Sequence, residues 1–423
     1  MKIDKWEEIF DKFEILKKIQ DTGRYEITSS QINQFREARL MTKFDNASQL
    51  PKIFTENKLS ILPITRGSYV ISPMEIFCKF PTIDHSSSIQ YFNFPDHIQS
   101  LSPEKINSEA LALNCVYLSG ILADFIEDDH LLPTICGKMS SLSFNFNVKS
   151  SISNSYIPIN IDKASIEIDG GYEGIETLSI IEAKNHLSDD FVIRQLYYPY
   201  RRLLLSKIEK KIKPIFLVYT NNIFYLYEYE FADVRNYNSL KLKRLKRYSF
   251  EKVTITVDDI EKILKQIIVA PEPAIPFPRA DSFERVINLC ELLNNSPLSK
   301  SDITINYGFD KRQTDYYVNA GKYLGLIETN KSGVSLTQEG YKIMSETQRN
   351  KQLGFVKKIL GHSIFNEVLK QQIKNGKILA KQEIISIMKK FQLFNCQSEE
   401  TYNRRASTVT SWIDWITSLT LSK

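Results

Sequence analysis

Short apolar runs separated by polar breaks fill the middle of the chain and predict strands. Residues 165–171 (SIEIDGG) and 178–185 (LSIIEAKN) have the length and apolar content of consecutive strands, which we expect to form one β-hairpin. Residues 189–205 repeat their side chains at helical spacing, and one of the two aspartates at their start is expected to cap the helix. Residues 212–220 are again apolar. The pattern therefore predicts a hairpin, a helix and a further strand in that order.

Helical spacing replaces the apolar runs in the C-terminal part of the chain. Residues 281–295, 299–307 and 310–326 predict three helices, and residues 327–337 predict two short strands around an Asn-Lys-Ser-Gly turn. Three helices followed by a small hairpin resemble the winged-helix family.

The winged-helix resemblance implies DNA binding, because the third helix of such a module enters the major groove. The residues that it implies for base or phosphate contacts are Lys311, Arg312, Gln313, Asp315 and Tyr316 in the third helix and Lys331 in the wing. Winged helices also serve as protein-docking modules, and the residues leave that alternative open.

Proline content predicts where the chain divides. Residues 270–280 hold four of the fifteen prolines, which predicts an extended connector, because proline cannot join a helix interior or an inner strand. We expect residues 1–269 to form one unit with an N-terminal helical extension, and residues 281–346 to form the winged-helix module. Residues 347–423 predict a further helical domain of the helix-turn-helix type.

The last predicted helix carries two adjacent arginines. Arg404 and Arg405 are expected to face outward near its start, as in a second DNA-binding helix. The alternative is a helical dimerisation tail whose arginines are solvated, and the pattern does not decide between the two.

Composition excludes several classes of protein. Apolar residues make up 42% of the 423 residues, enough for ordinary globular cores, and no apolar run reaches the roughly 18 residues that a membrane span needs. The five cysteines include no C-x-x-C pair, so neither a zinc ribbon nor a disulfide framework is indicated. The charged N-terminal segment is unlike a secretory signal, and we expect a cytoplasmic protein without membrane contact.

The overall charge is only weakly basic, at +5 with a pI near 8.6. Residues 241–248 (KLKRLKRY) concentrate five cations in eight residues, a composition suited to phosphate contacts. The alternative is a solvated, lysine-rich strand.

Three polar side chains in the predicted hairpin, Asp169, Glu182 and Lys184, suggest a catalytic site. Side chains of a strand repeat on one face every second residue, so Glu182 and Lys184 share a face while Ala183 faces the other way. The two glycines that follow Asp169 predict that the chain leaves the strand there, with Asp169 at the strand end beside the same cleft.

Two carboxylates and a lysine suit metal-dependent hydrolysis of a phosphodiester. Mg²⁺ prefers oxygen ligands, which Asp169, Glu182 and the carbonyl group of Ala183 can supply. Lys184 would orient or deprotonate the attacking water, or stabilise the transition state. The alternative is an exposed hairpin on which Glu182 and Lys184 form a salt bridge.

Residues 165–220 resemble the core of the PD-(D/E)XK nuclease superfamily. The segments IEIDGG, IIEAKN and RQLYYPYR are similar to those of bacterial type II restriction endonucleases. The resemblance implies an α/β fold with a restriction-endonuclease-like mixed sheet flanked by helices, and makes residues 1–269 the catalytic domain. It implies catalytic roles for Asp169, Glu182, Lys184 and Gln195, and an upstream acidic residue for which Glu109 is the candidate. Glu109 is equally well explained as a first-turn glutamate favoured by the helix dipole, and Ile168 stands where the superfamily motif has proline.

Together these features predict a bacterial, Mg²⁺-dependent, sequence-specific endonuclease that cuts double-stranded DNA. A homodimer is expected, because a palindromic site presents two equivalent phosphates. The likeness to restriction enzymes implies a companion DNA methyltransferase. The alternatives are a catalytically silent winged-helix regulator and a nuclease of repair or of modified DNA.

Overall fold

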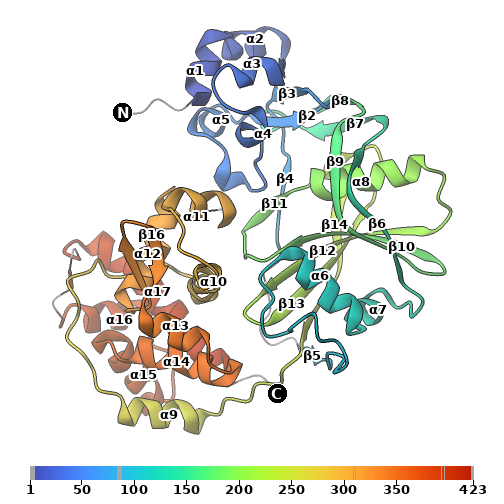
Figure 1. The fold of residues 1–423 in the computed structure, drawn as a ribbon. Helices are drawn as coiled ribbons and strands as arrows, with labels where there is room; N and C mark the ends of the chain where they lie inside the picture. Colours follow the sequence, from blue (N-terminus) through green and yellow to red (C-terminus); the bar gives the residue numbers. More distant parts are fainter. Residues whose placement is uncertain are drawn as a thin grey trace.

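The computed structural model describes residues 5–82, 88–307, 309, 311–391, 393–394 and 396–420, without the side chains of residues 305–307. The protein is mixed α/β, with a seven-stranded sheet in the order β5-β14-β13-β12-β10-β9-β6. A small N-terminal domain lies at one end of this sheet, and a helical C-terminal module lies beside it (Figure 1). No helix within these described ranges is long and apolar enough to span a bilayer.

The N-terminal domain packs short helices on a three-stranded antiparallel sheet. Trp6, Phe10 and Phe54 meet edge to face at its centre. The predicted helical extension therefore contains a sheet as well. Its elements are α1 (Lys5–Lys12), α2 (Ile15–Thr22), β1 (Tyr25–Thr28), α3 (Ser29–Asn33), α4 (Ala38–Met41), η1 (Ala47–Gln49), α5 (Lys52–Glu56), β2 (Ser60–Pro63) and β3 (Ser68–Ser72).

The central sheet contains the predicted hairpin and the further strand, and the predicted helix connects them. β9 (Ser165–Glu173) and β10 (Thr177–Lys184) pair antiparallel, and α8 (Arg194–Leu205) crosses to β12 (Lys211–Thr220), which runs parallel to β10. The sheet is completed by β5 (Ile89–Tyr91), β6 (Leu132–Ser140), β13 (Ile223–Phe231) and β14 (Leu240–Ser249). Two separate two-stranded sheets pair β4 (Phe77–Lys79) with β11 (Asp190–Val192) and β7 (Ser143–Lys149) with β8 (Tyr156–Asp162). The other elements are α6 (Glu109–Leu118), α7 (Ile121–Ile126) and η2 (Tyr237–Ser239).

Helices cover both faces of this sheet, and β10 alternates between them. Ile180 packs with Leu203 of α8, whereas Ile181 and Ala183 pack in the cluster formed by α6 and α7. Glu182 therefore lies on the α8 face, as the two-residue repeat of a strand requires.

The two glycines after Asp169 do not end the strand, contrary to the prediction. β9 continues to Glu173, and neither glycine has a positive φ. A Cβ atom on Gly171 would lie 2.7 Å from the Cβ atom of Ile135 in β6. Gly171 therefore lets β6 approach β9 closely, and Asp169 lies within the strand rather than at its end.

The helix after the hairpin begins later than predicted. Residues 190–192 form the short strand β11, which pairs with β4, and α8 starts at Arg194 without an aspartate cap. The carboxylate of Asp190 instead accepts a hydrogen bond from Ala47 N, at 2.9 Å. A tertiary contact to the N-terminal domain thus replaces the predicted cap.

The C-terminal module has the element order that the sequence predicts. It consists of α10 (Phe283–Leu293), α11 (Lys300–Tyr307), α12 (Lys311–Tyr323) and the antiparallel pair β15 (Ile327–Asn330) and β16 (Gly333–Leu336). The helices that follow are α13 (Gln338–Met344), α14 (Gln348–Leu360), α15 (Ser363–Asn375), α16 (Lys381–Met388) and α17 (Glu399–Ser418).

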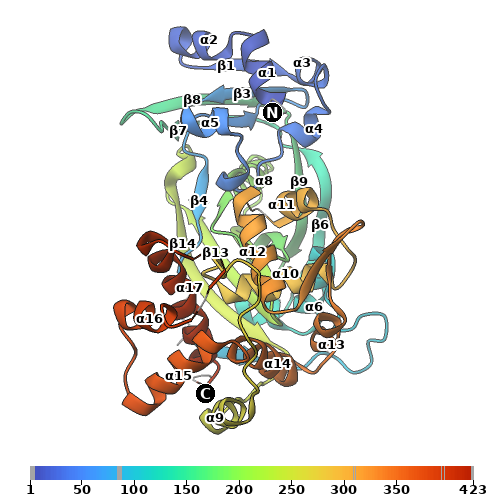
Figure 2. The same ribbon diagram turned by 90° about the vertical axis from the view of Figure 1, so that its left-hand side faces the viewer.

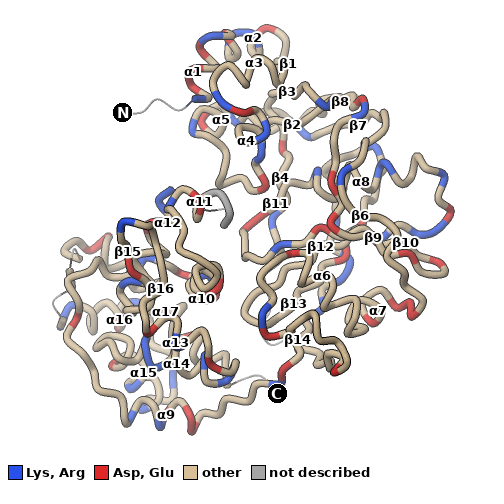
Figure 3. Tube along the Cα trace, in the orientation of Figure 1, with Lys and Arg blue, Asp and Glu red and all other residues tan. Residues whose placement is uncertain are grey.

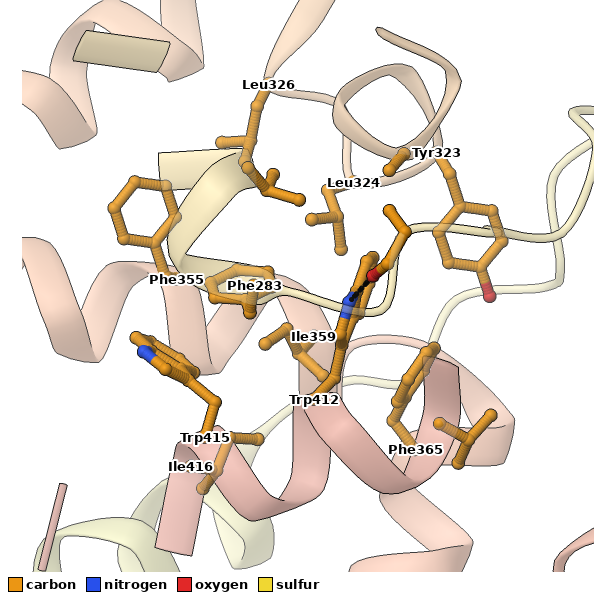
Figure 4. Close-up of a cluster of buried hydrophobic side chains, with 14 of the residues drawn as sticks. Phe283, Tyr323, Leu324, Leu326, Phe355, Ile359, Phe365, Trp412, Trp415 and Ile416 are labelled. Carbon is orange, nitrogen blue, oxygen red and sulfur yellow. Dashed lines mark hydrogen bonds between the residues drawn. The ribbon is translucent and has the colours of Figure 1, made fainter. Parts of the chain in front are cut away.

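One hydrophobic core joins all of these helices, and it extends across the predicted boundary between residues 346 and 347 (Figure 4). It also includes α9 (Val257–Gln266), together with Phe277 and Ala280 of the proline-rich segment. The segment is packed on the module. Its prolines keep it out of helices, and the side chains of Phe277, Pro278 and Ala280 are buried.

The largely buried side chain of His362, 12% exposed, gives this core a pH dependence. Its imidazole stacks on Tyr323, with ring centroids 4.0 Å apart, and burial lowers its pKa to about 4. The Lys358 ammonium lowers this pKa further, whereas a hydrogen bond with Tyr323 opposes the shift. An unfolded chain takes up this proton near its ordinary pKa of about 6.5, so stability is lost as pH falls from about 6.5 to 4, by about 3 kcal/mol.

Urea unfolding at pH 7 and pH 4.5 tests this expectation. His362→Gln is expected to reduce the loss of stability between the two values, whereas His130→Gln, at an exposed position, leaves it unchanged. Equal losses in the wild type and in His362→Gln would contradict the assignment.

Candidate active site

Asp169 is held beside β10 by a backbone contact. In the β9 and β10 pairing Ile181 lies opposite Gly170, which brings Asp169 next to the end of β10. One carboxylate oxygen of Asp169, Oδ2, accepts a hydrogen bond from Ala183 N at 2.9 Å. The local pairing of two strands is therefore enough to bring Asp169 to the Glu-Ala-Lys segment.

Glu182 is the most buried carboxylate of the group, with 8% of its surface exposed. Its Oε1 atom accepts hydrogen bonds from Lys184 Nζ and from Gln195 Nε2, each at 2.5 Å. Gln195 reaches it because α8 begins on this face of the sheet. Lys184 Nζ also donates to the carbonyl oxygen of Ala183 at 3.1 Å.

Glu109 approaches from the opposite helical layer. It is the first residue of α6, whose N-cap is Ser108, and its Oε1 atom lies 3.6 Å from Lys184 Nζ. The structure thus brings every predicted catalytic and metal-ligating side chain, and the Ala183 backbone, into one network of contacts. The members are Glu109, Asp169, Glu182, Ala183, Lys184 and Gln195.

Burial and neighbouring charges change the acidity of this group. Burial raises the pKa of Glu182 to about 8, with the Lys184 ammonium opposing the shift and Asp169 adding to it. Burial alone would lower the pKa of Lys184, but Glu182 and Glu109 outweigh it and keep the ammonium protonated. Burial also raises the pKa of Glu109.

Two further charged residues act on the site from the N-terminal domain. Asp45 affects the pKa of both Glu182 and Lys184, and its backbone oxygen accepts a hydrogen bond from Val192 N at 2.8 Å. Lys43 contributes to the field at Glu109. No sequence motif marks either residue, because a tertiary contact between distant segments brings them here.

The donor atoms are chemically suited to a hard divalent cation. The group contains the carboxyl groups of Glu109, Asp169, Glu182 and Asp45 and the ammonium groups of Lys184 and Lys43, so carboxyl groups outnumber cations. No three Asp, Glu, His or Cys side chains in the described part of the chain gather closely enough to hold a metal ion by themselves. Two carboxylates and the Ala183 carbonyl nevertheless form an all-oxygen set, and Mg²⁺ usually keeps several waters beside such ligands.

The predicted DNA-binding residues lie on the C-terminal module. Lys311 and Arg312 are exposed at the start of α12, and Gln313 is half-buried. Asp315 forms an ion pair with Lys300 of α11 at 2.6 Å. Lys331 is exposed in the turn between β15 and β16.

An arginine that sequence reasoning missed joins this surface to the last helix. Arg279 Nη1 donates to the Tyr316 hydroxyl at 2.7 Å, and its guanidinium lies 4.7 Å from the centre of that ring. Burial, with the Arg279 charge adding to it, lowers the pKa of Arg405, so Arg405 lies near the same point. Arg404 is exposed and paired with Glu400. The only signal for Arg279 was its position as the one cation of the proline-rich segment.

Two cations of the basic strand β14 form ion pairs inside the central domain, whereas Lys241 and Lys243 are exposed. Arg244 pairs with Glu228 at 2.8 Å, and Lys246 pairs with Asp124 of α7 at 3.0 Å. These contacts hold β14 against its neighbours. Lysine and arginine positions are otherwise spread over both halves of the molecule (Figure 3).

Three family models match the chain, and each is described as a domain of unknown function. Residues 3–71 match Domain of unknown function (DUF6996), residues 72–249 match Domain of unknown function (DUF6997), and residues 285–421 match Domain of unknown function (DUF7226). No curated protein and no solved structure matches the chain significantly. The second match contains Glu109, Asp169, Glu182, Ala183, Lys184 and Gln195, and the third contains α12 and α17.

Proposed function

We propose that the protein is a Mg²⁺-dependent, sequence-specific endonuclease of double-stranded DNA, with a restriction-endonuclease-like central domain. The observation that carries the proposal is the convergence of Asp169, Glu182 and Lys184 through paired strands β9 and β10. The crossover from β10 through α8 to a parallel β12, with α6 on the other face, supports the fold.

The residues have distinct roles in this proposal. Asp169, Glu182 and the Ala183 carbonyl would hold Mg²⁺, which when bound neutralises phosphate charge and acidifies a water. Gln195 donates to Glu182 and fixes the direction in which its carboxylate points. Lys184, kept protonated by the surrounding carboxylates, donates hydrogen bonds to a phosphoryl oxygen or to the attacking water.

The C-terminal module would bind the substrate. Cationic and amide side chains at the start of α12 suit phosphate and base contacts. Arg279 and Arg405 extend this surface toward α17. A homodimer on DNA and a companion methyltransferase complete the proposal, because both strands of a palindrome must be cut and the cell's own sites must be protected.

Plasmid digestion tests the function directly. With Mg²⁺ we expect discrete fragments, and with EDTA we expect intact plasmid, because EDTA removes the cation that would neutralise phosphate charge and acidify the water. Binding is measured in parallel by gel shift in EDTA, where the C-terminal module is expected to retain DNA.

The other outcomes separate the alternatives. Smeared or structure-dependent nicking favours a repair nuclease, and cutting confined to methylated plasmid favours a modification-dependent one. Intact plasmid in Mg²⁺ together with a gel shift favours a silent regulator and contradicts the endonuclease proposal.

A further inference from the structure

One polar face of α10 is buried against the central domain. Arg285, Asn288 and Glu291 are three residues apart along this helix, so they share one side of it. Each forms hydrogen bonds with the central domain. α10 lies on the side of the module turned toward the central sheet (Figure 1), and it lies in front of that sheet in the perpendicular view (Figure 2).

Asn288 holds the chain immediately after Lys184. Its Nδ2 atom donates to the carbonyl oxygen of Asn185 at 3.0 Å, and its Oδ1 atom accepts from Leu187 N at 3.2 Å. The residue is 2% exposed. Arg285 binds the far end of the same loop, with Nη2 2.8 Å from Asp189 Oδ1.

Glu291 holds the end of the neighbouring parallel strand. Its Oε1 atom accepts from Asn221 N at 2.8 Å, and its Oε2 atom accepts from the Thr220 hydroxyl at 3.1 Å. Asn288 Nδ2 also donates to this carboxylate, at 3.0 Å. One helix of the C-terminal module therefore holds the segments that follow both β10 and β12, at the sheet edge where active sites of parallel sheets usually lie.

The hydrogen bonds between Asn288 and residues 185–187 require one position of that loop. A buried interface gains stability from apolar side chains without directional requirements. An amide that both donates to and accepts from one loop is satisfied only when the loop backbone has one position, since each unmade bond leaves a buried polar group unpaired. The contact thus fixes residues 185–187, and through them the backbone of Lys184.

We propose that Asn288 is a positioning residue for cleavage, so that the DNA-reading module fixes the backbone that carries Lys184. The proposal rests on the proposed nuclease function and deepens it: the module that binds DNA also sets the geometry of the cutting group. Seating of α10 on the loop is then a condition for catalysis and not only for stability.

The experiment compares the full-length wild type with Asn288→Ala, Asn288→Asp and Asn366→Ala. Asn366 is a matched control, because it is 3% exposed and its amide donates to a backbone carbonyl, that of Leu360, inside the module. Asn288→Asp keeps the size and the acceptor for Leu187 N but loses both donor bonds, to Asn185 and to Glu291, and places a second carboxylate beside Glu291. It serves if the alanine variant does not fold.

For both Asn288 variants we expect the single-turnover cleavage rate at saturating protein to fall about 10- to 100-fold, with unchanged DNA affinity in EDTA. Amide hydrogen exchange of a peptide covering residues 185–189 is expected to accelerate, and Asn366→Ala is expected to change neither quantity.

The failures are distinguishable. An unchanged cleavage rate, or unchanged exchange of this loop, in the Asn288 variants overturns the positioning role while leaving the nuclease proposal intact. A wild type that does not cut overturns the nuclease and the positioning role together, and that result is seen before any variant is made.

Discussion

Lys184→Ala is expected to reduce Mg²⁺-dependent cleavage by about 10²–10³-fold, the usual cost of removing one donor that stabilises a transition state. Lys184 is the only described lysine whose ammonium contacts both Glu182 and the Ala183 carbonyl, two of the three proposed metal ligands. Gel-shift affinity for DNA in EDTA is expected to be nearly unchanged, because the proposed binding surface lies on the C-terminal module. Single-turnover cleavage of a plasmid measures the loss.

A matched control exists next to the same sheet, in the residue that precedes β12. Lys210 Nζ donates to the Glu173 carboxylate at 2.6 Å and to the Gly174 carbonyl at 2.8 Å, the same pair of contact types as Lys184. Lys210→Ala is therefore expected to cut at the wild-type rate. Equal rates for Lys184→Ala and the wild type would show that Lys184 has no part in the chemistry.

Folding of the variant has to be checked separately. Removing the ammonium leaves Glu182 buried without its cation, a change that costs several kcal/mol if the carboxylate stays ionised. The pKa of Glu182 is already raised to about 8, so proton uptake limits this cost. Thermal unfolding of the variant is expected to show a cooperative transition, which separates lost chemistry from lost structure.

The arrangement of Glu182 and Lys184 could be predicted from the sequence because strand geometry is local. A two-residue repeat alone places both side chains on one face, and antiparallel pairing of adjacent segments brings in Asp169. The glycines after Asp169 were misinterpreted, since a glycine that provides space for a neighbouring strand and one that turns the chain look identical in sequence.

No local sequence pattern marks the residues that are brought together only by contacts between distant segments. Asp45 reaches the site through the docking of the N-terminal domain on β11, and Asn288 through the docking of α10 on the loop after β10. The proline-rich segment was predicted from backbone chemistry alone. Burial of Phe277 and the bond from Arg279 to Tyr316 depend on helices that follow it in the chain, which its composition does not encode.

Trp412→Ala is expected to destabilise the whole C-terminal module by about 3–5 kcal/mol, the usual cost of deleting a large buried aromatic side chain. The indole is fully buried, stacks on Phe365 with centroids 5.1 Å apart, and meets Phe283 edge to face at 5.1 Å (Figure 4). Its Nε1 atom donates to the carbonyl oxygen of Ala280 at 2.7 Å. Such a loss is a large share of the roughly 5–15 kcal/mol that stabilises a typical domain.

Hydrogen exchange of the Trp412→Ala variant tests whether the hydrophobic core of the C-terminal module is continuous. Because Trp412 contacts side chains from both sides of residues 346 and 347, hydrogen exchange in α10 and α15 is expected to accelerate together in Trp412→Ala. DNA affinity of Trp412→Ala is also expected to fall, because Trp412 holds Ala280, and Ala280 adjoins Arg279 of the proposed DNA-binding surface. Trp412→Phe keeps most of the ring volume and loses only the hydrogen bond, for about 1 kcal/mol. Acceleration confined to α15 and α17, with α10 still protected, would instead show that residues 281–346 form a core of their own.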